Sequence, residues 1–209
     1  MKSIVWDLDG TLFNTLDLHI VSIKKSGKII INKEMSKLEI LKNQRGSILL
    51  NLYSLFGEKY YNEIQKEYKS AFIELLNKKL LIDSIGIVNF LKEIDKTNEY
   101  ENYIFTGRDK RTTYEILKYF NILNLFKEII CIDDCNNNKM SKFYIENFFC
   151  KLTNPVYITD DTKEVKYFRD NNIETYQVEW FNLKKRNNND NKKLNNIDDI
   201  YEILEEEKI

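Results

Sequence analysis

The sequence predicts an α/β fold: a Rossmann-like parallel sheet with helices on both faces, interrupted near its start by a small all-helical insertion. The first observation is that short apolar runs alternate with stretches whose apolar residues repeat at helical spacing, as in βαβ units. The second is that residues 15–81 carry helical repeats without the alternation of a strand. We therefore expect an α/β core at 1–14 and 82–209 and a helical domain at 15–81.

The first predicted strand, residues 4–6, runs directly into two acidic residues and a glycine. In a continuing strand, Asp7 and Asp9 would point to the same face of the sheet. Two carboxylates this close repel each other and need a cation or a proton, and Mg²⁺ prefers oxygen ligands. Gly10 permits a sharp turn. Because open α/β sheets bind ligands at the carboxyl ends of their strands, this turn is a candidate site for a metal and for proton transfer.

Two other interpretations of this turn are open to test on the sequence. Asp and Gly are common turn residues, so a surface turn capped by acids is the simplest alternative. A calcium loop requires Gly at its sixth position and Glu at its twelfth. Counted from Asp7, those positions hold Leu12 and Leu18, which excludes the calcium loop.

The helical stretch at 15–81 shows apolar stripes that we interpret as core packing. The clearest stripe consists of Ile64, Tyr68, Phe72, Leu75 and Leu76. His19 is the only histidine of the chain, and we expect it on a helix surface or at a helix cap. Lys42 and Arg45 can contact an anion, although solvated helix charges are the simpler interpretation.

Further strands are expected at 102–106, 129–132, 156–159 and 173–178. Helical stripes separate these strands, beginning with one at 86–95, and a last helix is expected at 197–206. Residues 182–196 are rich in Asn and Lys, which is typical of a low-complexity loop. We interpret the basic cluster at 184–186 as solvated surface.

Composition argues against several classes of function. The 209 residues carry a formal net charge of -1, which gives no electrostatic footprint for nucleic acid or a membrane surface. No apolar run is long enough to span a bilayer, and the amino terminus lacks the apolar region of a signal peptide, so we expect a cytoplasmic protein. A single histidine excludes a histidine-rich zinc site. Cys131, Cys135 and Cys150 are expected to be free thiols.

Two groups of residues that suit phosphate binding follow the second and third predicted strands. Thr106 and Gly107 end the second strand, where a hydroxyl and free backbone N–H groups can hold phosphate oxygens. Arg108 either reaches an anion or lies on the surface where the next helix starts. Lys139 and Lys142 precede or begin a helix, and either ammonium can bind phosphate as a point charge.

The fourth strand also ends in acids. Asp160 and Asp161 follow it directly, and Glu164 comes shortly after them. In a parallel sheet these acids would lie at the same edge as Asp7. Another acidic pair, residues 133–134, is interpreted as loop acids. Turn chemistry can explain each site alone, but several at the ends of predicted strands favour a single functional site.

These motifs resemble those of the haloacid dehalogenase superfamily, in particular its phosphoglycolate phosphatase-like subgroup with an inserted helical cap. The hexapeptide Asp-Leu-Asp-Gly-Thr-Leu at 7–12 resembles the first motif, and Thr106 the Ser or Thr of the second. Lys139 stands near the family's lysine, but the proline that often follows is Met140 here, so Lys142 remains a rival. The run 157–161, with Glu164 close behind, resembles the fourth motif, although the family often has Gly at position 159.

The resemblance implies a Mg²⁺-dependent phosphatase that forms an aspartyl-phosphate. Asp7 would attack phosphorus, and Asp9 would protonate the leaving alcohol and then take a proton from water. The implied phosphate-binding residues are Thr106, Gly107 and Lys139. The implied metal-binding residues are Asp7, Asp9 and Asp160, with Asp161 or Glu164 as the second acid of the last motif.

The resemblance also implies a small phosphorylated substrate for a monomer or homodimer that binds neither nucleic acid nor membranes. The residues of the helical insertion match no pattern that indicates a particular substrate. A dehalogenase is disfavoured because those enzymes lack the second acid of the first motif, which Asp9 supplies. A phosphomutase of the same superfamily uses the same acid pair and stays open. A phosphometabolite-binding protein without turnover is the alternative from another class.

Overall fold

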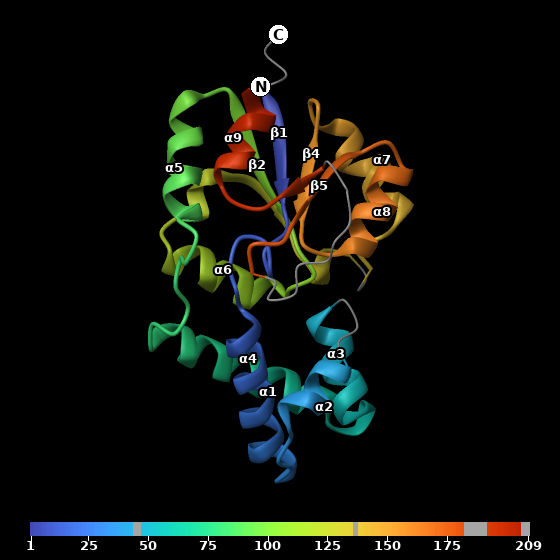
Figure 1. Cartoon of the computed structure of the whole chain (residues 1–209). Coiled ribbons are helices and arrows are strands. Elements are labelled where there is room, and N and C mark those ends of the chain that lie inside the picture. The colour runs from blue at the N-terminus through green and yellow to red at the C-terminus, as the bar shows by residue number, and fades with distance from the viewer. Residues whose placement is uncertain (44–46, 136–137, 182–191, 206–209) are drawn as a thin grey trace.

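A six-stranded parallel sheet forms the centre of the larger part of the molecule (Figure 1). The computed structural model describes residues 1–43, 47–135, 138–181 and 192–205. Within these residues the sheet order is β3-β2-β1-β4-β5-β6 and every pairing is parallel. The strands are β1 (Lys2–Trp6), β2 (Tyr100–Phe105), β3 (Phe126–Ile130), β4 (Val156–Thr159), β5 (Glu174–Val178) and β6 (Lys193–Leu194). The predicted Rossmann-like α/β class is confirmed.

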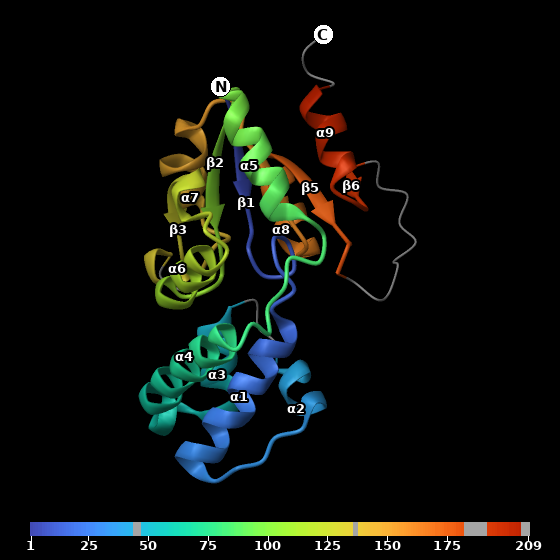
Figure 2. The same cartoon turned by 90° about the vertical axis from the view of Figure 1, so that its left-hand side faces the viewer.

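Helices cover both faces of the sheet, because successive side chains of a strand point to opposite faces and both faces are apolar. On β1, Ile4 and Trp6 belong to one buried cluster and Val5 to another. The first cluster contains residues of α5 (Ile87–Thr97), α6 (Lys110–Tyr119) and α9 (Asp198–Glu205). The second contains residues of α7 (Lys142–Asn147) and α8 (Thr162–Asp170). Figure 2 shows α5 in front of the sheet.

Four helices and one 3₁₀ turn form a separate helical module between β1 and α5. They are α1 (Leu16–Ile31), α2 (Lys37–Lys42), α3 (Ile48–Phe56), η1 (Glu58–Tyr60) and α4 (Tyr61–Asn77). Ser36 and Ser47 begin α2 and α3 with side-chain oxygens that accept the backbone N–H groups of Glu39 (3.1 Å) and Leu50 (3.2 Å). The predicted stripe on α4 is buried, and α4 packs along α1.

The helical module lies beyond the carboxyl ends of the strands (Figures 1 and 2). The chain enters it directly from the turn after β1, and α4 contacts α6 of the core. The order of the strands also reverses here, because the chain runs from β1 outward to β3 and returns to β4 on the other side of β1. Ligands of open α/β sheets bind at such a switch point, so the fold predicts a ligand-binding site at the ends of β1 and β4.

Two expectations about the secondary structure were wrong in detail. Residues 182–196 were expected to be a loop, but Lys193 and Leu194 form β6 beside Gln177 and Val178 of β5. A strand of two residues is too short to produce a period, although Leu194 is buried. The predicted strand at 129–132 instead ends at Ile130, and a 3₁₀ turn, η3 (Ile132–Asp134), follows. The basic cluster at 184–186 lies outside the described residues.

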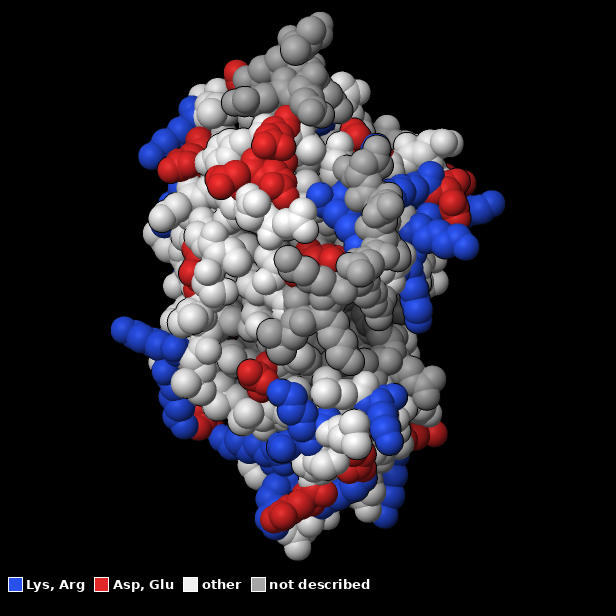
Figure 3. All heavy atoms as spheres, in the orientation of Figure 1, with Lys and Arg blue, Asp and Glu red and all other residues white. Residues whose placement is uncertain are grey.

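The surface carries both signs of charge. Figure 3 shows acidic and basic side chains on the core and on the helical module, on the face turned to the viewer. Among the residues that the structure describes, no helix combines the length and apolar character needed to cross a membrane.

The first prediction concerns the sheet that positions the site. Ile104 is fully buried in the middle of β2, so Ile104→Ala should lower the free energy of unfolding by about 2–5 kcal/mol through lost burial and a cavity. Ile29 on α1 is 55% exposed and supplies a matched control. Ile29→Ala should change stability by less than about 0.5 kcal/mol. Urea denaturation measures both, and equal effects would contradict the assignment of the core.

Candidate active site

The turn after β1 presents Asp7 at the carboxyl edge of the sheet. The backbone N–H of Asp7 donates to the carbonyl of Ile158 on β4 (2.9 Å), so the chain is still held by the neighbouring strand at this residue. The apolar residues of the turn, Leu8 and Leu12, are fully buried and fix the turn to the core. Asp7 is itself buried. A carboxylate is therefore held in a fixed place with little water around it.

Gly10 brings the ends of β1 and β4 close together. Its φ is +79°, and a Cβ atom at this position would lie 2.3 Å from Oδ2 of Asp160. The backbone N–H of Asp160 also donates to the hydroxyl of Thr11 (3.0 Å). Glycine is required here for two reasons, the positive φ and the space taken by the Asp160 carboxylate. Asp7 and Asp160 thus lie on the two sides of the switch point.

Lys139 connects the two strands through its ammonium group. Its Nζ donates to Oδ1 of Asp7 (2.9 Å), to the hydroxyl of Tyr157 (2.8 Å) and to Glu164 (2.9 Å). The side chain is 5% exposed. Lys142, the alternative considered from sequence, is exposed on α7. Of the two lysines, the structure brings Lys139 to Asp7.

The acids after β4 have different surroundings. Glu164 is buried and accepts hydrogen bonds from Lys139 and from the hydroxyl of Thr159 (3.0 Å). Asp161 instead begins α8 and accepts the backbone N–H of Lys163 (2.7 Å), as an N-cap residue does. Glu164 is therefore the acid that reaches the lysine, and Asp161 stabilises the start of the helix.

Asp9 points to a different set of partners from Asp7. Arg108 donates from Nε to both carboxylate oxygens (3.0 Å each) and from Nη2 to Oδ1 (2.8 Å), and the hydroxyl of Thr15 also donates to Oδ1. The guanidinium of Arg108 lies 4.2 Å from the ring centre of Phe72 on α4. Arg108 is fully buried, so of the two alternatives considered from the sequence the surface position is wrong, and the anion that Arg108 reaches here is the carboxylate of Asp9. Its burial depends on a helix distant in the sequence.

Thr106 and Gly107 complete the edge of the sheet. Trp6 pairs with Ile104 on β2, so Thr106 lies at the same end of the sheet as Asp7. Thr106 is buried, its N–H donates to Ile130 (3.0 Å), and its hydroxyl accepts the N–H of Arg108 (3.2 Å). The structure brings the end of β2 to the same edge as the ends of β1 and β4.

Negative charge exceeds positive charge around Lys139. Burial raises the pKa of Asp7 from 3.8 to about 7, against the lowering effect of Lys139. Burial and the charges of Asp7 and Glu164 raise the pKa of Asp160 well above its usual value. The attraction of Asp7 and Glu164 outweighs burial and raises the pKa of Lys139. A further cation is the natural complement of such a site.

Asp9 is in the opposite electrostatic situation. Burial acts to raise its pKa, but the charge and hydrogen bonds of Arg108 and the hydrogen bond from Thr15 outweigh burial and lower it. In the described part of the chain, no three His, Cys, Asp or Glu side chains are grouped as a metal site. Of the three predicted metal ligands, Asp9 is held by Arg108, and Asp7 and Asp160, whose charges interact, are the carboxylates that could hold a cation. This pair suits Mg²⁺, which keeps several waters and binds one or two protein carboxylates.

His19 lies inside the helical module, so the expectation of a surface or cap position was wrong. It is 5% exposed, and its Nδ1 lies 3.0 Å from the hydroxyl of Tyr68 on α4. Burial, assisted by the charge of Arg108, lowers the pKa of His19 to about 4, so the ring is neutral at pH 7. The reason is that α1 turns this face toward α4, which the local sequence does not reveal.

The remaining sequence candidates do not join the cluster around Lys139. Lys42 is exposed on α2, and Arg45 lies outside the described residues. Asp133 accepts the N–H of Lys110, and Asp134 accepts the N–H of Cys131 (3.1 Å), so both hold the loop after β3 as expected.

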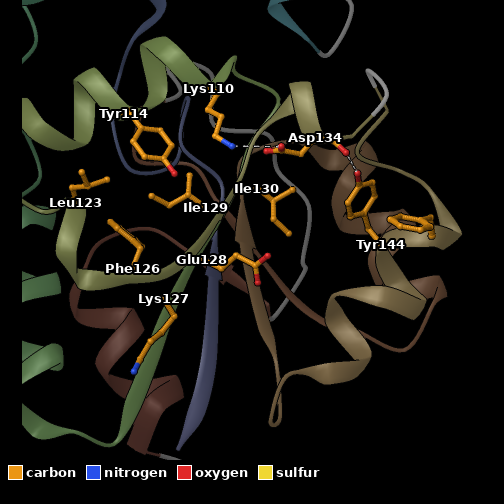
Figure 4. Close-up of a pocket in the computed structure, with 11 residues that line it drawn as sticks. Lys110, Tyr114, Leu123, Phe126, Lys127, Glu128, Ile129, Ile130, Asp134 and Tyr144 are labelled. Carbon is orange, nitrogen blue, oxygen red and sulfur yellow. Dashed lines mark hydrogen bonds and ion pairs between the residues drawn. The ribbon is translucent and has the colours of Figure 1, made fainter.

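A groove of about 650 Å³ lies elsewhere, along the edge strand β3 (Figure 4). Its walls include Tyr114 of α6 and Tyr144 of α7. Two of the charged groups in it already have partners, since Lys110 lies 3.7 Å from Asp134 and Lys127 lies 3.7 Å from Glu101. None of the residues around Lys139 lines this groove, so the groove is separate from the cluster at the switch point.

Comparison with known proteins bears on the family and the fold of the chain. The family model of the haloacid dehalogenase-like hydrolases matches residues 4–178. A Clostridium perfringens protein that carries the name pyrophosphatase PpaX is 35% identical over 75 residues, which cover 36% of this chain and 35% of that protein. The alignment thus spans about a third of the relative.

Solved structures show the same fold over nearly the whole chain. A Haemophilus somnus protein predicted to be a phosphoglycolate phosphatase has a TM-score of 0.77 and 16% identity, with 98% of each chain covered. The HAD-hydrolase YfnB of Bacillus subtilis, bound to magnesium, has a TM-score of 0.70 and 15% identity, again with 98% of each chain covered.

The second prediction follows from the raised pKa of Asp7. Between pH 4 and 7 the folded state holds a proton on Asp7 that the unfolded state has released, so the free energy of unfolding falls as pH rises through this window. Asn has no such proton to lose. With EDTA present, Asp7→Asn should therefore stabilise the protein by about 4 kcal/mol at pH 8 and by only about 2 kcal/mol at pH 5.

Urea denaturation at both pH values measures this difference. Asp95→Asn, an exposed change on α5, is the control and should be neutral at both. A destabilising effect of Asp7→Asn at pH 8 would show that the Asp7 carboxylate is not held at a cost in the folded protein.

Proposed function

Because this chain belongs to the family of haloacid dehalogenase-like hydrolases, we propose that it is a Mg²⁺-dependent phosphatase that hydrolyses a small phosphorylated metabolite through an aspartyl-phosphate on Asp7. The observation that carries the proposal is the cluster at the switch point. There, the ammonium of Lys139 lies 2.9 Å from Asp7 and 2.9 Å from Glu164. The carboxylate of Asp160 lies against Gly10, which belongs to the same turn as Asp7.

In the first step, an oxygen of Asp7 forms a bond to phosphorus while the bond from phosphorus to the leaving oxygen breaks. Asp9 gives a proton to the leaving oxygen. In the second step, water attacks the phosphorus of the aspartyl-phosphate, Asp9 takes a proton from that water, and the bond to Asp7 breaks. Covalent catalysis of this kind divides one difficult displacement into two easier ones.

The arrangement of partners gives the two acids different roles. Asp7 lies beside Lys139, and Asp9 is held by Arg108 and Thr15. Neither carboxylate shares the partners of the other. We assign Asp7 to the bond with phosphorus and Asp9 to the proton on the pattern of the family. Because Arg108 and Thr15 lower the pKa of Asp9, Asp9 would have to give up these hydrogen bonds to carry the proton when substrate binds. Acid–base help of this type is worth about 10²–10⁴-fold.

Positive charge and hydrogen-bond donors must balance the negative charge on the phosphoryl oxygens. This electrostatic stabilisation is the largest part of catalysis in phosphoryl transfer. The hydroxyl of Thr106 and the backbone N–H of Gly107 would donate to these oxygens, and the ammonium of Lys139, held at Asp7, would contribute its positive charge. Mg²⁺ held by the carboxylates of Asp7 and Asp160 would supply the remaining positive charge. Glu164 keeps Lys139 in place, and Asp161 acts only through the start of α8.

The third prediction tests the nucleophile. Asp7→Asn should lower Mg²⁺-dependent release of phosphate from p-nitrophenyl phosphate by more than about 10³-fold, because an amide oxygen cannot form the intermediate. EDTA should abolish the wild-type activity. Asp133→Asn changes an acid of the loop after β3 and should leave activity unaltered. Asp7→Asn with wild-type turnover would remove Asp7 from the role of nucleophile.

The fourth prediction compares two lysines three residues apart. Lys139→Ala should lower kcat/KM for p-nitrophenyl phosphate by about 10²–10³-fold, since a buried positive charge held at Asp7 is lost. Lys142→Ala should have no comparable effect, because Lys142 is exposed on α7. Steady-state kinetics on both variants decides the matter, and the reverse order of effects would assign the role to Lys142.

A further inference from the structure

Tyr157 is a buried tyrosine whose hydroxyl lies inside the charged cluster. It occupies the middle of β4, opposite Val5 of β1, and is fully buried. Its hydroxyl accepts a hydrogen bond from Nζ of Lys139 (2.8 Å) and donates one to Oε2 of Glu164. Tyr157 begins the stretch 157–161 that resembles the fourth motif, but the resemblance gives it no role, because the acids of that motif follow the strand in which Tyr157 stands.

Lys139 has as many partners as it has protons to donate. An ammonium group has three N–H donors, and its acceptors here are Asp7, Tyr157 and Glu164, all within 2.9 Å. Because the three N–H bonds diverge at tetrahedral angles, two fixed acceptors determine the direction of the third. Tyr157 and Glu164 therefore aim the remaining N–H bond at Asp7.

Tyr157 is a rigid acceptor. Its ring packs against those of Phe168 (centroids 4.8 Å apart), Phe149 (5.8 Å) and Phe105 (6.1 Å). Glu164 is more flexible by itself, but the hydroxyls of Tyr157 and Thr159 both donate to its Oε2. The phenol thus fixes Lys139 directly and also through Glu164.

The neutrality of the phenol is as important as its rigidity. A third carboxylate next to Lys139 would attract the ammonium away from Asp7 and add repulsion to a site that already has excess negative charge. A phenol accepts the hydrogen bond without carrying a charge. The phenol donates its own proton in a hydrogen bond to the carboxylate of Glu164.

We propose that Tyr157 is a positioning residue, which holds the ammonium of Lys139 against Asp7, the carboxylate to which the phosphoryl group would be transferred. This inference rests on the proposed phosphatase activity. Without the hydroxyl, one N–H bond of Lys139 has no acceptor at that position, and the ammonium can turn toward Glu164. A shift of this size is enough to lower the rate, since a misplacement of about 1 Å can cost about 10²-fold.

The test removes single hydroxyls from two tyrosines of the same buried cluster. Tyr157→Phe should lower kcat/KM for p-nitrophenyl phosphate in Mg²⁺ by about 10–100-fold. Tyr103 on β2 is the matched control, because its ring also packs in this cluster but its hydroxyl donates to Glu101 (2.8 Å) instead. Tyr103→Phe should change kcat/KM by less than about twofold.

Binding of inhibitors separates positioning from general damage. Orthovanadate adopts the five-coordinate geometry of the transition state, and inorganic phosphate does not. In Tyr157→Phe, the inhibition constant of orthovanadate should rise by about the same factor as kcat/KM falls, and that of phosphate by much less. Equal weakening of both inhibitors would overturn the inference.

A double-mutant comparison covers the case in which the phenylalanine variant is poorly folded. In a Lys139→Met background no ammonium needs positioning, so adding Tyr157→Phe should cost nothing further. A loss of the same size with and without Lys139 would show a structural role and overturn the inference, while the proposed activity would stand. If the wild-type protein releases no phosphate from any phosphomonoester tested, the proposed function fails and this inference with it.

Discussion

The contact between Lys139 and Asp7 is the interaction on which the rest of the site depends. The ammonium of Lys139 contacts Asp7 and Glu164 directly, and all three side chains are largely removed from water, while the half-buried Asp160 interacts with them electrostatically. Burying charge is costly unless it is paired, so this cluster is stable only with more positive charge or with a proton. The same imbalance that raises the pKa of Asp7 makes the site suitable for a divalent cation and a phosphate.

The fold explains why these groups meet. A parallel sheet whose order reverses at β1 places the ends of β1 and β4 side by side, and Gly10 allows the two ends to approach closely. The helical module then closes the other side, where Phe72 of α4 stacks on Arg108. Arg108 in turn binds Asp9, whereas Asp7 is paired with Lys139. Two acids only two residues apart thereby acquire different electrostatic surroundings.

Local patterns in the sequence predicted five of the six strands and the acids at the edge of the sheet, but not the two-residue β6. Buried strands can be identified in the sequence as apolar runs, and the acids at their ends are the residues that directly follow these runs. Burial of polar residues could not be predicted in this way. His19 and Arg108 are covered by α4, which is distant in the sequence, and Tyr157 looks like any strand residue. Lys139 and Lys142 differ only in which one the loop before α7 directs inward.

The central claim is that the carboxylates of Asp7 and Asp160 share one cation beside a phosphate that contacts Lys139. The most direct measurement is a crystal structure of the wild-type protein grown with Mg²⁺ and inorganic phosphate. The account predicts a cation in contact with both carboxylates and phosphate oxygens facing Lys139 and Thr106. A cation bound elsewhere at saturating Mg²⁺, or a phosphate outside the switch point, would contradict it.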